Sequence, residues 1–163
     1  RDKYEFTPAD IETINTHVAP GHRSVCDITE PKTGLEVKFS IRHCIAMALS
    51  GLDTSDDNAY TDEIASRDDL KALRRKVDVD ATALDNRYAA KLNIKLINGL
   101  ELSTTADVGL PATDLDAQEA RLVDKFTRLA TPVIGQGRAL TTVNLVRDLE
   151  NQDNLDALIK AVE

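Results

Sequence analysis

The spacing of hydrophobic and polar residues changes along the chain, and each change predicts a different element. Alternation of apolar and polar residues predicts β-strands over residues 14–18 and 77–81. Pro20 follows the first of these strands and is expected to end it, since proline cannot continue a hydrogen-bonded ladder. Residues 25–28 resemble a further short extended segment, closed by a turn-rich stretch.

Residues 41–49 repeat at helical spacing instead. Ser40 is suited to cap the start of this helix, and Gly51 is suited to end it. The helix is the most apolar of the chain, so we expect it to lie against the sheet. Its apolar stripe consists of Ile41, Cys44, Ile45, Ala48 and Leu49.

A β-hairpin is predicted around residues 97–99. A two-residue turn would pair Leu96 with Glu101 and place the apolar residues of the two strands on opposite faces. A three-residue turn pairs Leu96 with Leu100 and keeps the apolar residues together. Hydrophobic register therefore selects the longer turn, with Gly99 in the left-handed conformation.

The last third of the sequence is helical in pattern. One helix is expected to end at Pro132, a glycine-containing linker follows at residues 135–137, and a last short helix begins near Asp153. Together these elements predict an α+β fold: a small, mainly antiparallel sheet packed against helices, with a helical C-terminal third. A length of 163 residues suits one domain covering residues 1–163.

Composition narrows the classes of function. The formal net charge of −8 disfavours nucleic-acid binding, and the basic run at residues 71–76 is expected to be a solvated helix face. We find no stretch long enough to cross a membrane and no signal peptide, so a soluble cytoplasmic protein is expected. Cys26 and Cys44 are expected to be reduced thiols.

Metal binding is not predicted. The acidic loop at residues 53–63 has the spacing of a calcium loop at first sight, but Asn58 stands where glycine is needed and Ile64 where glutamate is needed. The two cysteines and three histidines show no zinc or iron–sulfur spacing. We therefore expect no metal and no cofactor.

One group of residues could carry chemistry. Lys38, Ser40 and His43 stand at the start of the helix predicted over residues 41–49, where free amides and the helix dipole favour an anion. Ser40 and His43 are three residues apart and share a face, and His43 could exchange a proton near neutral pH. On residue types alone a structural role is favoured: Ser40 as a cap, Lys38 as a solvated cation, and His43 as a structural histidine.

The run CDITEPKTGLEVKFSIRHCIAMALSG at residues 26–51 resembles the signature of the MmgE/PrpD family, in which a turn leads into a KFS-type motif and an alanine-rich helix. Weaker similarities follow in order over nearly the whole chain, at residues 76–80, 98–99, 109–111 and 125–126.

This resemblance implies an enzyme that uses neither metal nor cofactor and acts on small di- and tricarboxylates. Known activities of the family are 2-methylcitrate dehydratase, cis-aconitate decarboxylase and iminodisuccinate epimerase. It also implies that the chain is the C-terminal α+β domain of a homodimeric two-domain protein, with the active site in the cleft beside an N-terminal helical domain. The helical tail at residues 114–163 would pack on that domain.

Within the motif, the resemblance implies substrate-binding roles for Lys38, as the basic residue, and for Ser40, as the serine. His43 departs from the family, which often has tyrosine at this position, and is the candidate catalytic residue. Both side chains can donate a hydrogen bond, but their reach and pKa differ. The departure therefore bears on the type of reaction.

Two functions remain open from the sequence. The first is the C-terminal domain of a 2-methylcitrate dehydratase-type lyase, with the isolated chain inactive. The second is a non-catalytic α+β binding or assembly module, since no complete catalytic set is visible. The enzyme hypothesis predicts an exposed apolar patch on the final helices, where the helical domain would dock.

Overall fold

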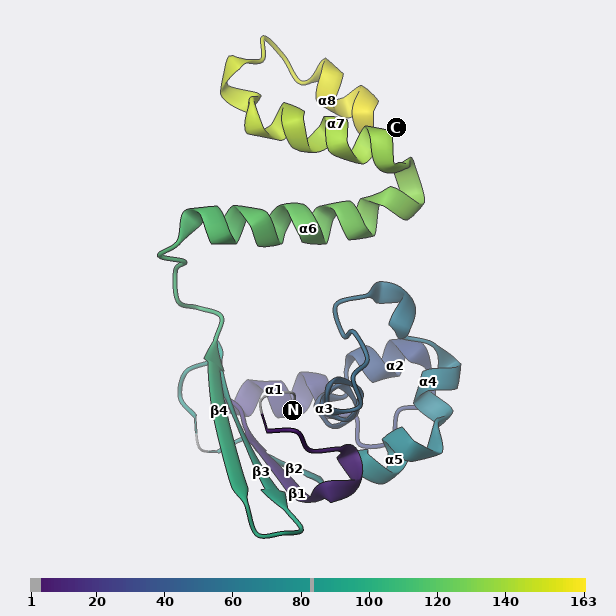
Figure 1. Cartoon of the computed structure of the whole chain (residues 1–163), viewed down its shortest axis with the longest axis vertical. Helices are drawn as coiled ribbons and strands as arrows, with labels where there is room; N and C mark the ends of the chain where they lie inside the picture. The colour runs from purple at the N-terminus through teal and green to yellow at the C-terminus, as the bar shows by residue number, and fades with distance from the viewer. Residues whose placement is uncertain (1–3, 83) are drawn as a thin grey trace. The chain divides into compact units, whose positions relative to one another are not determined.

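The computed structural model describes residues 4–82 and 84–163, and the chain folds as two compact units, residues 1–110 and 111–163. The first unit contains η1 (Pro8–Asp10), β1 (Ile11–His17), α1 (Pro20–Cys26), α2 (Gly34–Lys38), α3 (Ile41–Leu49), η2 (Asp57–Ala59), α4 (Asp62–Ser66), α5 (Asp68–Arg74), β2 (Val77–Asp80), β3 (Ala89–Leu96) and β4 (Glu101–Asp107) (Figure 1). The second contains α6 (Leu115–Ile134), α7 (Gln136–Arg147), η3 (Leu149–Asn151) and α8 (Asp156–Val162). The class is α+β, as predicted. One domain over 1–163, within a larger two-domain protein, stays a prediction.

The sheet of the described residues has four strands in the order β2-β1-β3-β4. β1 pairs antiparallel with β3, and β3 with β4, but β1 and β2 run parallel. The sheet is therefore mixed, which corrects the prediction of a mainly antiparallel sheet. The reason is topological: the chain leaves β1, forms α1 to α5, and returns to pair β2 with the free edge of β1 in the same direction.

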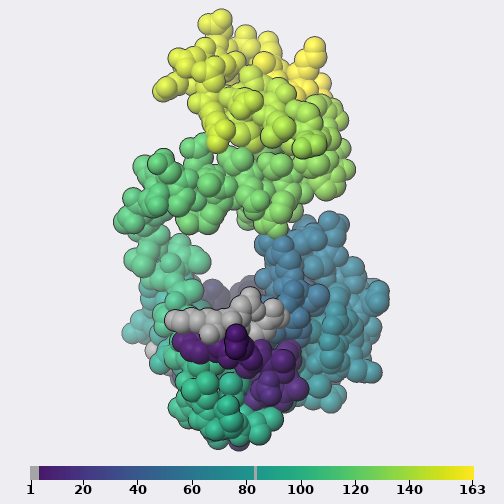
Figure 2. Space-filling model, in the orientation of Figure 1, coloured from purple at the N-terminus to yellow at the C-terminus, as the bar shows by residue number. Residues whose placement is uncertain are grey.

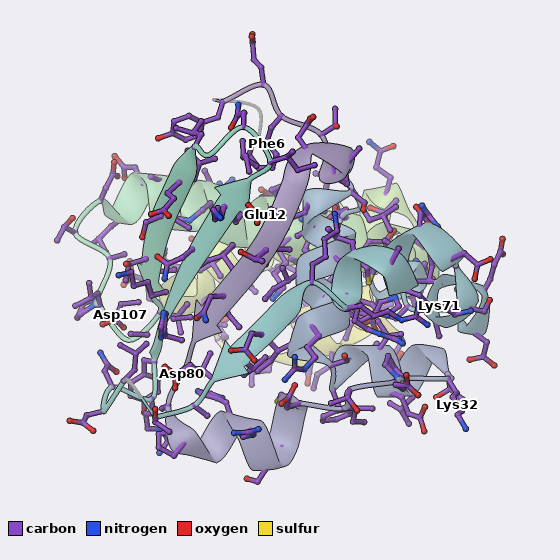
Figure 3. The ribbon with its side chains drawn as sticks, turned by 90° about the horizontal axis from the view of Figure 1, so that it is seen from below. Phe6, Glu12, Lys32, Lys71, Asp80 and Asp107 are labelled. Atoms are coloured by element: carbon purple, nitrogen blue, oxygen red, sulfur yellow. The ribbon has the colours of Figure 1, made fainter. Side chains whose placement is uncertain are left out.

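The two faces of the sheet differ in polarity. Ile14 on β1 and Val77 and Val79 on β2 are buried in one apolar cluster with residues of α3 and α5. The neighbouring positions on these strands are polar and point to the opposite face, as the two-residue period of a strand requires. Figure 3 shows Glu12 on β1, and Asp80 and Asp107 at the ends of β2 and β4. Burial of one face explains why alternation predicted these strands.

The hairpin between β3 and β4 has the predicted register. Ile94 pairs with Leu102, and the amide of Leu96 donates to the carbonyl of Leu100 at 2.8 Å. Gly99 has a φ of 87°, a conformation that glycine adopts without strain. The turn also contacts the N-terminal segment, because the amide of Ile97 donates to the carbonyl of Asp10. Figure 2 shows the purple N-terminal residues directly against the green residues of this hairpin.

Several local predictions need correction. The segment predicted to be extended over residues 25–28 is helical in its first half, because α1 begins at Pro20 and runs to Cys26, while Asp27 forms an isolated β-bridge with Ser40. Proline suits the first helical position, where its missing N–H is not needed.

In the second unit, α6 continues through Pro132 to Ile134 and ends at Gly135, whose φ is 81°. The predicted linker at residues 135–137 is reduced to Gly135, because α7 begins at Gln136.

Helix α3 buries a different face from the one predicted. Of the predicted stripe, Leu49 is buried, but Ala48 is exposed and the other three residues are half-buried. The inward residues are His43, Ala46 and Met47. α3 packs on α5 and α2 as well as on β2, so it is covered on more than one side. A helix with two covered faces does not reveal the more deeply buried one through a single apolar stripe.

The helices of the second unit leave much of their apolar surface open. Leu122, Val146 and Ile159 are each more than half exposed. A groove of about 570 Å³ runs between α6 and α7 and is lined by Leu122, Val123, Phe126 and Val146, with the ion pair of Glu119 and Arg147 at 2.6 Å beside them. The expected exposed apolar residues on the final helices are therefore present. None of the helices described in 4–82 and 84–163 is both long and apolar enough to span a membrane.

Candidate functional site

The residues singled out by the sequence lie at the junction of α2 and α3, but they do not share one surface. Lys38 ends α2 and is exposed, whereas Ser40 and His43 are completely buried. The expected row of three side chains facing a ligand is therefore not what the structure presents. Each of the three has a distinct set of contacts.

Ser40 has both of its hydrogen-bonding functions satisfied inside the fold. Its Oγ donates to the carbonyl of Ile28 at 2.6 Å and accepts from the amide of His43 at 3.2 Å, which makes it the N-cap of α3. An isolated bridge between Asp27 and Ser40 brings the preceding loop across the start of the helix. The tip of α3 is therefore covered by the chain itself.

Asp27 brings a carboxylate to this helix tip. Its side chain is 5% exposed and accepts from Arg42 in the first turn of α3, with Nε at 2.8 Å and Nη2 at 3.3 Å. Nη1 of Arg42 donates to the carbonyl of Val77 and so ties α3 to β2. The anion expected near this helix N-terminus is thus a side chain of the same unit.

Lys38 is held by local contacts. Its Nζ lies 2.7 Å from Oδ1 of Asp57 and 5.3 Å from the centre of the Tyr60 ring. Asp57 is 78% exposed, so this ion pair is solvated and of low energy. Of the three predicted residues, Lys38 is the one that an external ligand can reach.

His43 is an interior histidine with a defined tautomer. Its Nε2 lies 3.1 Å from the carbonyl of Ile64, and because a carbonyl can only accept, Nε2 carries the proton. Nδ1 is then free to accept, and Nη1 of Arg74 donates to it at 3.4 Å. Burial lowers the pKa of His43, and the charge of Arg74 lowers it further, while the bond to Ile64 opposes the shift. The imidazole is therefore neutral at neutral pH.

Arg74 is the functional candidate that sequence reasoning missed. It is 5% exposed, although the basic run that contains it was expected to be a solvated face. Its position four residues after Leu70 puts it on the buried stripe of α5, and this spacing was the available signal. Burial lowers the pKa of its guanidinium; Glu30 opposes this shift and Arg75 adds to it.

Arg74 borders a polar cavity of about 260 Å³ beside α5. The cavity is lined by Thr29, Glu30, Arg42, Arg74, Arg75 and Val77. Among the residues that the structure describes, no group of three or more His, Cys, Asp and Glu side chains could hold a metal ion. Cys26 and Cys44 are free thiols, and burial raises the pKa of Cys44. What the arrangement offers chemically is a set of cationic hydrogen-bond donors, the guanidinium groups of Arg42, Arg74 and Arg75.

The structure thus shows an α+β domain with a mixed sheet and a polar cavity that is lined by three arginines. Residues 1–151 match the family described as MmgE/PrpD C-terminal domain, and the chain belongs to that family. This confirms the resemblance that residues 26–51 carried. No curated protein matches the chain.

Proposed function

We propose that the chain is the C-terminal domain of a lyase of the 2-methylcitrate dehydratase type, acting on small di- or tricarboxylates in the cytoplasm. The observation that carries the proposal is the family match, which spans residues 1–151. The chain supplies substrate-binding cations, and an N-terminal helical domain of the same polypeptide supplies the groups that transfer protons. The complete protein is a homodimer and needs neither metal nor cofactor.

The proposed reaction is an elimination of water. A base removes the proton on the carbon next to a carboxylate, and the electrons of that C–H bond form a C=C bond. The C–O bond of the hydroxyl on the adjacent carbon breaks, and the hydroxyl leaves as water after taking a proton. Negative charge develops on the carboxylate during proton removal, so nearby cations lower the barrier.

Each of the three motif residues has a role in this proposal. Lys38 binds a substrate carboxylate by exchanging its solvated partner Asp57 for the substrate. Ser40 and His43 act as positioning residues, because both are buried and their polar atoms are engaged within the domain. Ser40 fixes the first turn of α3, and His43 orients Arg74.

The exposed apolar residues of α6 to α8 support a docking role for the tail. An exposed apolar groove between helices is a typical contact site for another protein surface. In the proposed enzyme these helices pack on the helical domain.

The test is expression of the complete protein, including the coding sequence upstream of residue 1. Purified protein is mixed with citrate-like acids, 2-methylcitrate among them, and alkene formation is followed by absorbance. We expect turnover with at least one acid and none from residues 1–163 alone. Lys38→Gln should raise KM by roughly tenfold through loss of a charge-assisted contact, while Lys32→Gln, an exposed lysine near the start of α2, is the control. Absence of alkene from every acid would leave the non-catalytic module as the better description.

A further inference from the structure

The cavity beside α5 contains a buried cation without an anionic partner. Arg74 is 5% exposed, and its one hydrogen bond among the described residues is to the neutral ring of His43. No carboxylate in residues 4–82 or 84–163 forms an ion pair with it. A buried guanidinium is normally paired, because removing its charge from water is costly. The missing anion therefore points to a ligand.

The direction of Arg74 is set by the interior of the fold. Nη1 is held by Nδ1 of His43, whose own orientation is fixed by the carbonyl of Ile64. A guanidinium has five N–H donors in one plane, so fixing one of them orients the others. Arg74 also lines the cavity.

The cavity favours an oxyanion over other ligands. Arg75 adds a second cation, while the charge of Arg42 is already balanced by Asp27. Glu30 is the acidic residue in the cavity lining. It is exposed and is near enough to Arg74 to raise the pKa of the guanidinium. The cavity is about 260 Å³, below the usual range for drug-sized ligands, which suits a small acid. A cationic cavity is notable in a chain of net charge −8.

We propose that Arg74 and Arg75 form a carboxylate-binding site for a small organic acid, with His43 as the positioning residue of Arg74. The planar guanidinium of Arg74 accepts a carboxylate by two parallel N–H donors, and Arg75 neutralises a second carboxylate of the same acid. Glu30 competes with the ligand for Arg74 and lowers the affinity. The choice of a carboxylate over another oxyanion rests on the proposed function; the presence of an anion site does not.

Binding is tested with the unaltered 163-residue chain and tricarballylate, a tricarboxylate that has no hydroxyl group to eliminate. NMR of the isotope-labelled chain should show saturable shifts at the side-chain Nε–H groups of Arg74 and Arg75 and at the amide of Val77. The neutral triamide of the same acid is the ligand control and should cause no shift. Inorganic phosphate should bind more weakly. Equal binding of phosphate would overturn the carboxylate assignment, and shifts confined to other residues would overturn the site.

Variants sharpen this test. Arg74→Gln should abolish binding, and Arg75→Gln, which alters an exposed residue, should weaken it by about tenfold. Glu30→Gln should strengthen binding severalfold, since it removes the competing carboxylate. Arg67→Gln is the matched control, because Arg67 also lies at α5 but is paired with Asp69 at 2.5 Å. Should Arg74→Gln fail to fold, the shifts of the unaltered chain and the Arg75→Gln variant decide the question.

The outcome is independent of turnover. Binding that depends on Arg75, together with a complete protein that forms no alkene, would support the site and overturn the proposed enzyme. Turnover with affinities unchanged in Arg74→Gln and Arg75→Gln would support the enzyme and overturn the site. Failure of tricarballylate to bind the chain at all also overturns the site.

Discussion

The two units of the chain use apolar residues in opposite ways. In residues 1–110, Ile11, Ile14, Met47 and Leu70 are at most 1% exposed and belong to one cluster. In residues 111–163, the buried positions are mostly small, such as Ala139 and Ala161, and most of the large apolar residues are exposed. The first unit has a hydrophobic core, whereas the second presents a surface. Exposed apolar residues gathered on one segment are typical of a surface that contacts another protein.

The largest expected difference concerns leucine truncation. Leu70→Ala should lower the free energy of unfolding of the first unit by about 2–5 kcal/mol, through lost burial and the cavity left behind. Leu122→Ala, at a position that is 60% exposed, should cost less than about 0.5 kcal/mol. Urea unfolding followed by tyrosine fluorescence reports the first unit, because all three tyrosines lie within it. Hydrogen exchange of residues 111–163 reports the second. Equal costs would mean that the second unit has a core of its own.

The next difference concerns ion pairs of the same chemistry. Asp27 and Arg42 are 5% and 16% exposed, whereas Glu119 and Arg147 are 51% and 53% exposed. Asp27→Asn should destabilise the first unit by about 3 kcal/mol, because it leaves a largely buried guanidinium without its partner. Glu119→Gln should cost at most about 1 kcal/mol in the second unit. Denaturant titration of both variants at one salt concentration measures the contrast, and a large loss for Glu119→Gln would contradict it.

The smallest expected difference is in pH dependence. The pKa of His43 is lowered in the folded state, chiefly by burial, so the unfolded chain binds the proton more readily. The contribution of the neutral histidine is complete above its ordinary pKa of about 6.5, and it is lost as the pH falls below that value toward the folded pKa. The loss is at most about 1.4 kcal/mol per pH unit.

His43→Gln tests this contribution, because glutamine can still donate to Ile64 and accept from Arg74. The stability of the variant relative to the unaltered chain should therefore rise as the pH falls below about 6.5. The second unit contains no histidine, so its hydrogen exchange should show no difference between the two proteins. Parallel pH profiles for the two proteins would mean that His43 does not titrate differently on folding.

Prediction from sequence worked where one face of an element is covered. β1, β2 and β3 each bury residues of one face, and Leu102 of β4 packs partly against the same core, so alternation gave the strands. The requirement that apolar residues share a face gave the register at Leu96 and Leu100. It failed for α3, which is covered on more than one side. The parallel pairing of β1 with β2 also could not be read from the pattern, because alternation is the same for either strand direction.

The candidate site could be predicted from the sequence only in part. The motif directed attention to residues 38–43, and Ser40 was correctly predicted as the N-cap of the helix that follows. The motif could not reveal that Ser40 and His43 are both buried, since a polar residue can be interior whenever its hydrogen bonds are satisfied there. Arg74 was missed because a run of basic residues usually marks a solvated face.

By itself, the sequence determined the family, the α+β class, the strands and the turn at Gly99, because each depends on local spacing or on a contiguous motif. Only the tertiary structure decided that the tip of α3 is closed by Asp27 and Ser40, and that His43 faces Arg74 across 31 positions of the chain. The reason is physical. Burial and pairing of a polar side chain depend on which distant elements pack around it, and no periodicity along the chain records that.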